Sequence, residues 1–333
     1  MSTIQTKSVV FQSVVIDTIL NEKISIRAIV IDKDKIWYAG DENRFGYYNL
    51  NTRQKEEKQI QSDSLKLEFR SMAQNKEAIF MANIGNPAYI FKIDKSNLNF
   101  QKVYTENNEK AFYDSMNFWN AKEGIAIGDP AEDCLSILIT RDCGNTWKKI
   151  VCRNLPKVVD GEAAFAASNT NICIKGNKTW IVSGGKKARV FYSHDKGNSW
   201  EVFETPIIQG QAMTGIFTAD FYDENIGVIA GGNYELPNQN YQNKAMTVDG
   251  GKTWKLIAEN AGFGYASCVQ FVPESNGKQL VSVGATGLYY SADGGNSWKQ
   301  FLADKTLYTI RFLNETTAVA AGKDKIIRIK FKK

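Results

Sequence analysis

Thr247-Val-Asp249-Gly-Gly251-Lys-Thr253-Trp254 is an octet that the chain repeats, and this repeat decides the fold. Three further copies keep Ser or Thr, Asp, Gly, Ser or Thr, and Trp at the same offsets. They occupy residues 140–147, 193–200 and 291–298. The steps from Trp to Trp are 53, 54 and 44 residues, which predicts a series of similar structural units along the chain.

Each position of the octet has a physical role in a tight turn. The Asp side chain accepts hydrogen bonds from N–H groups of its own turn, and the Gly adopts a positive φ that other residues avoid. The Trp buries a large apolar ring where the next strand begins. Strand-like segments flank every copy, so we expect each octet to be the turn of a β-hairpin. The Asp and Trp residues expected to hold these turns are Asp142, Trp147, Asp195, Trp200, Asp249, Trp254, Asp293 and Trp298.

The octets and the strands before them resemble those of Asp-box (BNR) repeat proteins. These include sialidases, sortilin-type receptors, xyloglucanases and photosystem II stability/assembly factor-like propellers. Upstream of each octet an apolar strand ends at a glycine, as in Gly227-Val-Ile-Ala-Gly231 and Leu280-Val-Ser-Val-Gly284. This order is most similar to the assembly-factor-like group. The resemblance implies that each octet joins the third and fourth strands of a propeller blade, and its motifs specify fold and not function.

The chain predicts seven blades of four antiparallel strands. Two degenerate blades precede the four with octets, around Ile36-Trp-Tyr-Ala-Gly40 and Ala78-Ile-Phe-Met-Ala82. Residues 306–333 supply only three strands of the last blade, so we expect a strand at residues 9–16 to complete it. Pairing both chain ends in one blade removes an open sheet edge. We therefore expect an all-β, seven-bladed β-propeller with N/C-terminal strand closure, forming one domain over residues 1–333.

Composition favours strands and gives no sign of a nucleic-acid or membrane partner. Aromatic residues make up 12% of the chain, and the formal net charge is +5. Basic residues cluster only in the C-terminal Lys330-Phe-Lys-Lys333, so we expect no nucleic-acid binding. No apolar run reaches the ~18 residues of a membrane span. The N-terminus has no leader pattern. Asp-box propellers are mostly extracytoplasmic, so we favour that location over the cytoplasm, and we expect a monomer.

Cysteine and histidine contents argue against a metal or cofactor. The chain has five cysteines, none in a Cys-x-x-Cys pair, and His194 is its single histidine. Cys134 and Cys152 lie nine residues either side of Cys143, on strands that we expect to face each other. Cross-strand geometry is often poor for a disulfide, so we expect free thiols. No glycine motif for a dinucleotide is present, and we expect neither metal nor cofactor.

Arginines on the expected innermost strands of blades one, two and seven are candidates for a site in the central channel. They are Arg27, Arg70 and Arg311. By their alignment we expect their guanidinium groups to converge, where they would bind a carboxylate or a phosphate. In the alternative arrangement they point at solvent or pair with channel carboxylates, for which blade three offers Asp114 and blade four offers Glu162. Residues 160–169 are the expected innermost strand of blade four, and their small side chains leave room in the channel or pack tightly at a narrow axis.

A loop of blade five, residues 232–243, is much longer than the matching Ala285-Thr-Gly287 of blade six. It contains Tyr234 and Tyr241, and loops on rigid scaffolds often carry function. A tolerated insertion without a role is the alternative. We therefore consider this loop a candidate contact surface.

The leading hypothesis is a non-enzymatic scaffold or binding module that recognises a protein partner or an anionic ligand at the channel face. The alternative is a glycan-active or glycan-binding, sialidase-like propeller that uses Arg27, Arg70, Arg311 and Glu162. Sialidases resemble the chain in their octets but have six blades and an Arg-Ile-Pro motif, which is absent here. We therefore expect no catalytic residues. An enzymatic activity, if present, would be of the glycoside hydrolase kind.

Overall fold

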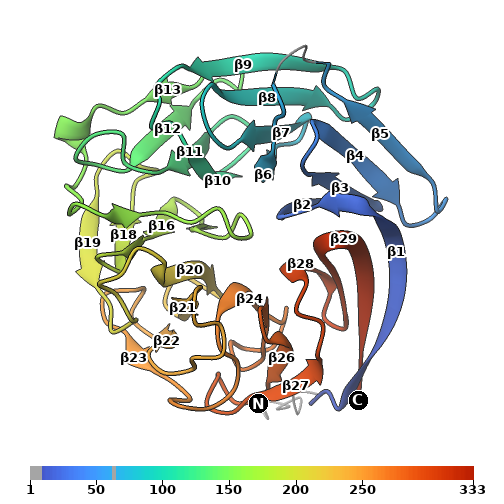
Figure 1. The fold of residues 1–333 in the computed structure, drawn as a ribbon, viewed down its shortest axis with the longest axis vertical. Coiled ribbons are helices and arrows are strands. Elements are labelled where there is room, and N and C mark those ends of the chain that lie inside the picture. Colours follow the sequence, from blue (N-terminus) through green and yellow to red (C-terminus); the bar gives the residue numbers. More distant parts are fainter. Residues whose placement is uncertain (1–9, 62–64) are drawn as a thin grey trace, which may run out of the picture.

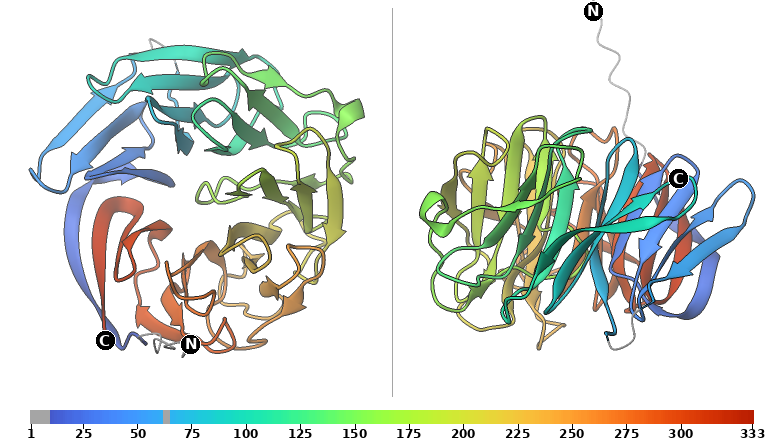
Figure 2. Two further views of the ribbon diagram at one scale, coloured as in Figure 1. Left: turned by 180° about the vertical axis from the view of Figure 1, so that it is seen from behind. Right: turned by 90° about the horizontal axis from the view of Figure 1, so that it is seen from above.

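The protein folds into a ring of seven antiparallel sheets around a central axis (Figure 1). A computed structural model describes residues 10–61 and 65–333. Seen from the edge of the ring, the sheets stand side by side and form a short, wide cylinder (Figure 2). This arrangement is a seven-bladed β-propeller, and it confirms the fold predicted from the octets.

The first six blades follow one another along the chain, each with four strands running from the axis to the rim. Blade one contains β2 (Ala28–Asp32), β3 (Lys35–Ala39), β4 (Arg44–Asn49) and β5 (Lys55–Gln59). Blade two contains β6 (Phe69–Gln74), β7 (Ala78–Asn83), β8 (Ala88–Asp94) and β9 (Phe100–Glu106). Blade three contains β10 (Tyr113–Phe118), β11 (Gly124–Gly128), β12 (Ser136–Thr140) and β13 (Lys148–Lys149).

The next three blades keep this plan. Blade four contains β15 (Ile172–Lys175), β16 (Lys178–Val182), β18 (Arg189–Ser193) and β19 (Glu201–Glu204). Blade five contains β20 (Thr214–Phe221), β21 (Gly227–Asn233), β22 (Lys244–Thr247) and β23 (Lys255–Leu256). Blade six contains β24 (Ala266–Phe271), β25 (Leu280–Gly284), β26 (Gly287–Ser291) and β27 (Lys299–Leu302).

Blade seven is built from both ends of the chain. Its innermost strand is β28 (Leu307–Asn314), and β29 (Thr317–Lys332) doubles back to supply the next two positions (Figure 1). The outermost strand is β1 (Ser13–Ser25), which pairs antiparallel with the second half of β29. The predicted closure is confirmed, but the strand runs to Ser25 and not to residue 16. Residue 9 lies outside the described residues.

The innermost strand of blade four starts later than predicted. β15 takes this position, whereas residues 160–169 contain only the two-residue β14 (Glu162–Ala163). β14 pairs with β17 (Gly184–Gly185), and β17 also contacts β20, so these short strands link blades four and five. The prediction of an inner strand at 160–169 is wrong. The segment has no β-branched residue, and such composition disfavours a strand.

The hydrophobic core lies between neighbouring blades. The second strand of a blade is covered on both faces and is therefore buried along its whole length, as in β11 and β25. Phe80 of blade two packs with Met116 and Trp147 of blade three in one such cluster. Among the described residues the only helix is the single turn η1 (Cys152–Asn154), and none is long and apolar enough to cross a membrane.

The four octets form the turns between the third and fourth strands of blades three to six. In blade five the Asp249 carboxylate accepts hydrogen bonds from the Thr247 hydroxyl (2.7 Å), the Thr253 N–H (3.0 Å) and the Thr253 hydroxyl (2.6 Å). The Thr247 hydroxyl accepts a further one from the Gly251 N–H at 3.0 Å. The same set recurs in the other three octets. Partial burial acts to raise the pKa of Asp249, but these hydrogen bonds outweigh it and lower the pKa to about 2.

Cys134 and Cys152 form a disulfide, with their Cα atoms 5.5 Å apart. The prediction of free thiols is therefore wrong for this pair. Cys152 begins the turn η1 and lies beyond Lys148–Lys149, the two residues of β13 that pair with β12. The other three cysteines, Cys143, Cys173 and Cys268, are free thiols.

Replacing the octet tryptophans should destabilise the protein unequally. Trp147 is 5% exposed and packs against Phe80 and Phe118, so we expect Trp147→Ala to cost about 3–5 kcal/mol. Trp254 is only half-buried, and Trp254→Ala should cost clearly less. Urea denaturation of both variants measures the difference. Equal losses would contradict the packing described here.

Candidate functional site

The segment that joins blades three and four passes through the centre of the propeller. Residues 164–171, here called the plug, leave β14 and project into the space between the innermost strands before β15 begins (Figure 1). The Ser168 carbonyl accepts hydrogen bonds from the Thr309 hydroxyl (3.3 Å) and Arg311 Nη2 (3.1 Å), both of blade seven. The Ser168 hydroxyl donates to the Ser267 carbonyl of blade six. One short segment thus binds strands on the far side of the ring.

Asn169 holds the plug to blades two and three with its side-chain amide. Its Oδ1 accepts from the N–H of Met116 (3.0 Å) and of Met72 (3.3 Å), and its Nδ2 donates to the Met72 carbonyl (2.8 Å). The backbone of Asn169 has φ +59°, a region that asparagine tolerates better than most residues. The amide therefore behaves like a peptide group inserted between two sheet edges.

The base of the plug is fixed by a buried ion pair. The Glu162 carboxylate accepts hydrogen bonds from Arg189 Nε (2.9 Å) and the Ser183 hydroxyl (2.6 Å), and Glu162 is 2% exposed. Glu162 was predicted to face the channel on an inner strand, and this prediction is wrong. The segment that contains Glu162 does not form the innermost strand of blade four. The Glu162 carboxylate therefore pairs with Arg189 at the start of β18 and does not face the channel.

A ring of inner-strand residues surrounds the plug. Register irregularities place one unpaired residue at an equivalent point near the start of five innermost strands. These residues are Arg70, Asp114, Phe217, Ser267 and Tyr308. Arg27 takes the same place in blade one, because Ile26 N–H bonds Gly322 as Phe69 N–H bonds Gly40. The six residues are called the inner ring, and the side of the propeller where the innermost strands begin is called the start face.

The three channel arginines do not form one cluster. Arg27 donates to the Ala167 carbonyl (3.4 Å) and lies over the Tyr308 ring at 4.3 Å, while Arg70 pairs with Glu68. Arg311 lies three residues beyond Tyr308, roughly 10 Å further along its strand. The predicted convergence is wrong because the blade-seven equivalent of Arg27 and Arg70 is Tyr308. The arrangement needed for a sialidase-like arginine triad is therefore missing at these positions.

The alignment that places Asp114 correctly is visible in the sequence. The inner strands of blades two and three begin with similar sequences, Phe69-Arg70-Ser-Met72 and Tyr113-Asp114-Ser-Met116. Their second residues, Arg70 and Asp114, both belong to the inner ring. Asp114 is fully buried, and neither of its oxygens makes a hydrogen bond in the described part of the chain. It therefore lies beneath the start face and does not reach solvent.

Asp129 lies close to Asp114 and shares its environment. One Asp129 oxygen accepts the Ala164 N–H of the plug at 3.0 Å. Burial raises the pKa of Asp129 to about 6, and burial together with the charge of Asp129 raises the pKa of Asp114 well above its usual value, while Arg70 opposes that rise. Two buried carboxyl groups, both harder to ionise than ordinary aspartates, thus lie beneath the plug.

An aromatic row runs from the plug to the blade-five loop on the start face. Phe165 of the plug stacks on Phe217 at 3.9 Å, Phe217 meets Tyr265 edge-on at 4.8 Å, and Tyr265 meets Tyr234 at 5.2 Å. Tyr234 is 47% exposed and is followed in the loop by Leu236 at 57% and Tyr241 at 40%. The loop predicted as a contact surface therefore presents exposed apolar side chains beside the inner ring.

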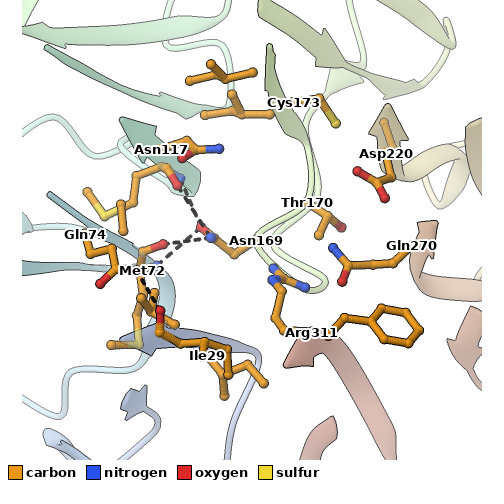
Figure 3. Close-up of a pocket in the computed structure, with 18 of the residues that line it drawn as sticks. Ile29, Met72, Gln74, Asn117, Asn169, Thr170, Cys173, Asp220, Gln270 and Arg311 are labelled. Atoms are coloured by element: carbon orange, nitrogen blue, oxygen red, sulfur yellow. Dashed lines mark hydrogen bonds between the residues drawn. The ribbon is translucent and has the colours of Figure 1, made fainter. Parts of the chain in front are cut away.

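The opposite mouth of the channel holds a separate pocket of 460 Å³ (Figure 3). Its charged lining residues are Arg311, Lys175 and Asp220, and plug residues Asn169 and Thr170 also line it. Arg27 and Arg70 do not line this pocket. Sequence reasoning found Arg311 but missed Lys175 and Asp220, because their strand positions depend on where β15 and β20 begin. Within residues 10–61 and 65–333 no group of three or more His, Cys, Asp or Glu side chains is placed to hold a metal ion.

No protein-family model matches the chain, and no curated protein is similar to it. Solved structures are similar in fold. YCF48 bound to D1 peptide is 13% identical, with a TM-score of 0.69, and the match covers 98% of this chain and 97% of that chain. YCF48 from Cyanidioschyzon merolae is 13% identical, with a TM-score of 0.65 and coverage of 95% and 98%. The RRP9 WD40 repeats are 11% identical, with a TM-score of 0.67 and coverage of 97% and 100%. At such identities the likeness shows the fold alone.

Replacing Asp129 with Asn should stabilise the protein at neutral pH. A folded-state pKa of about 6 lies above the unfolded value, so the native protein binds more protons and loses stability as pH rises from about 4 to 6. Because Asn cannot ionise, Asp129→Asn removes this loss. The free energy of unfolding should rise by about 2–3 kcal/mol at pH 7.5 and change little at pH 4. Urea denaturation at both pH values tests it, with the exposed Asp160→Asn as control. If Asp129→Asn changes the free energy of unfolding equally at both pH values, the raised pKa of Asp129 would be contradicted.

Proposed function

We propose that the protein is a non-enzymatic, monomeric binding module that captures a segment of a protein partner on the start face. The observation that carries this proposal is that two inner-ring arginines and the exposed aromatic loop of blade five share the start face. Ala167 of the plug and Tyr265 connect Arg27 to this loop. Arg and Tyr are the residues most enriched at binding hot spots, because they combine apolar area with directed hydrogen bonds. The closed ring holds the arginines on its innermost strands, and the loop projects from the same rigid scaffold.

The two arginines keep donors that the protein itself does not use. Arg27 is half-buried and donates through Nη1 alone in the described part of the chain, so its Nη2 group is unused. Arg70 bonds Glu68 through Nε at 2.7 Å, and its side chain is 26% exposed, so the outer edge of its guanidinium is open. Guanidinium groups favour carboxylates, and the loop offers Tyr234 and Leu236 for apolar side chains. The expected partner segment is therefore acidic with interspersed apolar residues.

Structures of similar fold support this kind of function. YCF48 has been solved with a D1 peptide bound, and WD40 repeats of similar architecture occur in RRP9. We further infer that the chain belongs among Asp-box propellers, since all four octets share one set of hydrogen bonds centred on the Asp carboxylate. The strand order and the octet position agree with that family.

We also propose an extracytoplasmic location. The Cys134–Cys152 disulfide supports it, because disulfides persist mainly in oxidising compartments. Mass spectrometry of the non-reduced protein taken from its native cells tests this location. Two free thiols at these positions would count against it.

Selection of random displayed peptides on the immobilised protein tests the start face. We expect enrichment of acidic, apolar-containing peptides. The double variant Arg70→Gln/Tyr234→Ser should bind a selected peptide about 10-fold or more weakly, because both anchors are removed. Fluorescence anisotropy with the labelled peptide gives the affinities.

Arg153→Gln is the matched control, since Arg153 is an exposed arginine of η1 at the rim. It should bind the peptide as the parent protein does. Peptides that bind the double variant as tightly as the parent, or a selection without enrichment, would rule out the start face as the binding surface.

A further inference from the structure

The pocket at the opposite mouth is a second site, separated from the start face by the plug. We call it the end-face pocket. The innermost strands end around it, and Asn169 and Thr170 of the plug form part of its lining (Figure 3). Its volume of 460 Å³ is within the range of small-molecule sites. Four amide side chains line it: Gln74, Asn117, Asn169 and Gln270.

Part of the lining is fixed by the fold. Arg311 Nη1 donates to the Thr309 hydroxyl (2.9 Å) and to the Ile310 carbonyl (2.8 Å), and Nη2 donates to the plug. Asp220 accepts the N–H groups of Phe221 (2.9 Å) and Phe271 (2.8 Å), which ties blade five to blade six. These contacts hold a cation and a carboxyl group in set orientations at the pocket wall.

Other polar groups of the pocket have no partner in the protein. Lys175 is the last residue of β15, and its ammonium group makes no hydrogen bond or ion pair in the described part of the chain. The same holds for the side-chain amide of Gln270. The Asn117 Oδ1 accepts the Phe118 N–H, but its Nδ2 has no bonded acceptor there. The unused groups are therefore mostly donors, and one of them carries a full positive charge.

The charge of the pocket favours an anion. Lys175 and Arg311 contribute two cations, and Asp220 is the single acid among the lining residues. Burial raises the pKa of Asp220, although Lys175 and Arg311 act in the opposite direction. Burial also raises the pKa of the Cys173 thiol in the same wall, so this thiol is not a ready nucleophile and the pocket is suited to reversible binding.

We propose that the end-face pocket binds a small polyhydroxylated anion, such as a sugar acid or a sugar phosphate. Lys175 and Arg311 bind the anionic group, and the free amides of Gln270 and Asn117 bind the hydroxyls. Sugar acids and sugar phosphates share this combination of one anionic group and several hydroxyls. The site does not depend on the start face, so either can exist without the other.

Isothermal titration calorimetry with glucuronate, glucose 6-phosphate, glucose and inorganic phosphate tests the proposal. At least one charged sugar should bind, and glucose and inorganic phosphate should bind much more weakly. Lys175→Gln should weaken binding of the charged sugar roughly 10- to 100-fold, the usual effect of losing a charge-assisted hydrogen bond. Gln270→Ala should weaken the charged sugar more than it weakens inorganic phosphate.

Lys148→Gln is the control, since Lys148 is an exposed lysine of β13 at the rim. It should leave binding unchanged, and thermal denaturation of each variant verifies that it is folded. Absence of binding by both charged sugars would overturn the proposal. Binding of glucose as tight as that of the charged sugars would overturn the role of charge. Unchanged affinity in a folded Lys175→Gln variant would overturn the location.

Discussion

The innermost strand of every blade has an edge that faces the axis and has no neighbouring strand. Backbone N–H and C=O groups on that edge must find partners or water, and a narrow channel limits water. Here the plug supplies the partners. The Asn169 amide bonds the backbone of Met72 and Met116. The Thr170 carbonyl accepts the Ala219 N–H, and the Ser168 hydroxyl donates to the Ser267 carbonyl. The rest of the central architecture follows from satisfying these edges.

Closing the axis divides the propeller into two unlike faces. The start face combines inner-ring arginines with an aromatic row, and the end face keeps a polar pocket with two cations. The plug can do this because it consists mainly of small residues, which fit between strands without forcing the blades apart. Its base is held by the Glu162–Arg189 pair, and the Cys134–Cys152 disulfide secures the chain that leads to it.

The parts predictable from sequence are those with local hydrogen-bonding rules. An octet closes its own turn within eight residues, so its pattern reveals the hairpin and, by repetition, the blades and the closure of the ring. The exposure of Tyr234 and Tyr241 also followed from the length of their loop. The plug was not predictable in this way, because a chain segment that crosses the axis has partners from all six other blades. The sequence feature that could have revealed the plug is the lack of β-branched residues in 160–169. Arg311 was wrongly aligned with Arg27 and Arg70, because the unpaired residue at Tyr308 shifts the register of β28.

Hydrogen exchange of the Met72 and Met116 amides in an Asn169→Gly variant tests the central claim most directly. Glycine tolerates the positive φ at this position, so the substitution removes the side-chain amide without adding backbone strain. If the plug satisfies the inner edges, both amides should exchange much faster in the variant, while the amide of Ile125 in the second strand of blade three stays protected. Unchanged protection of Met72 and Met116 would contradict the account.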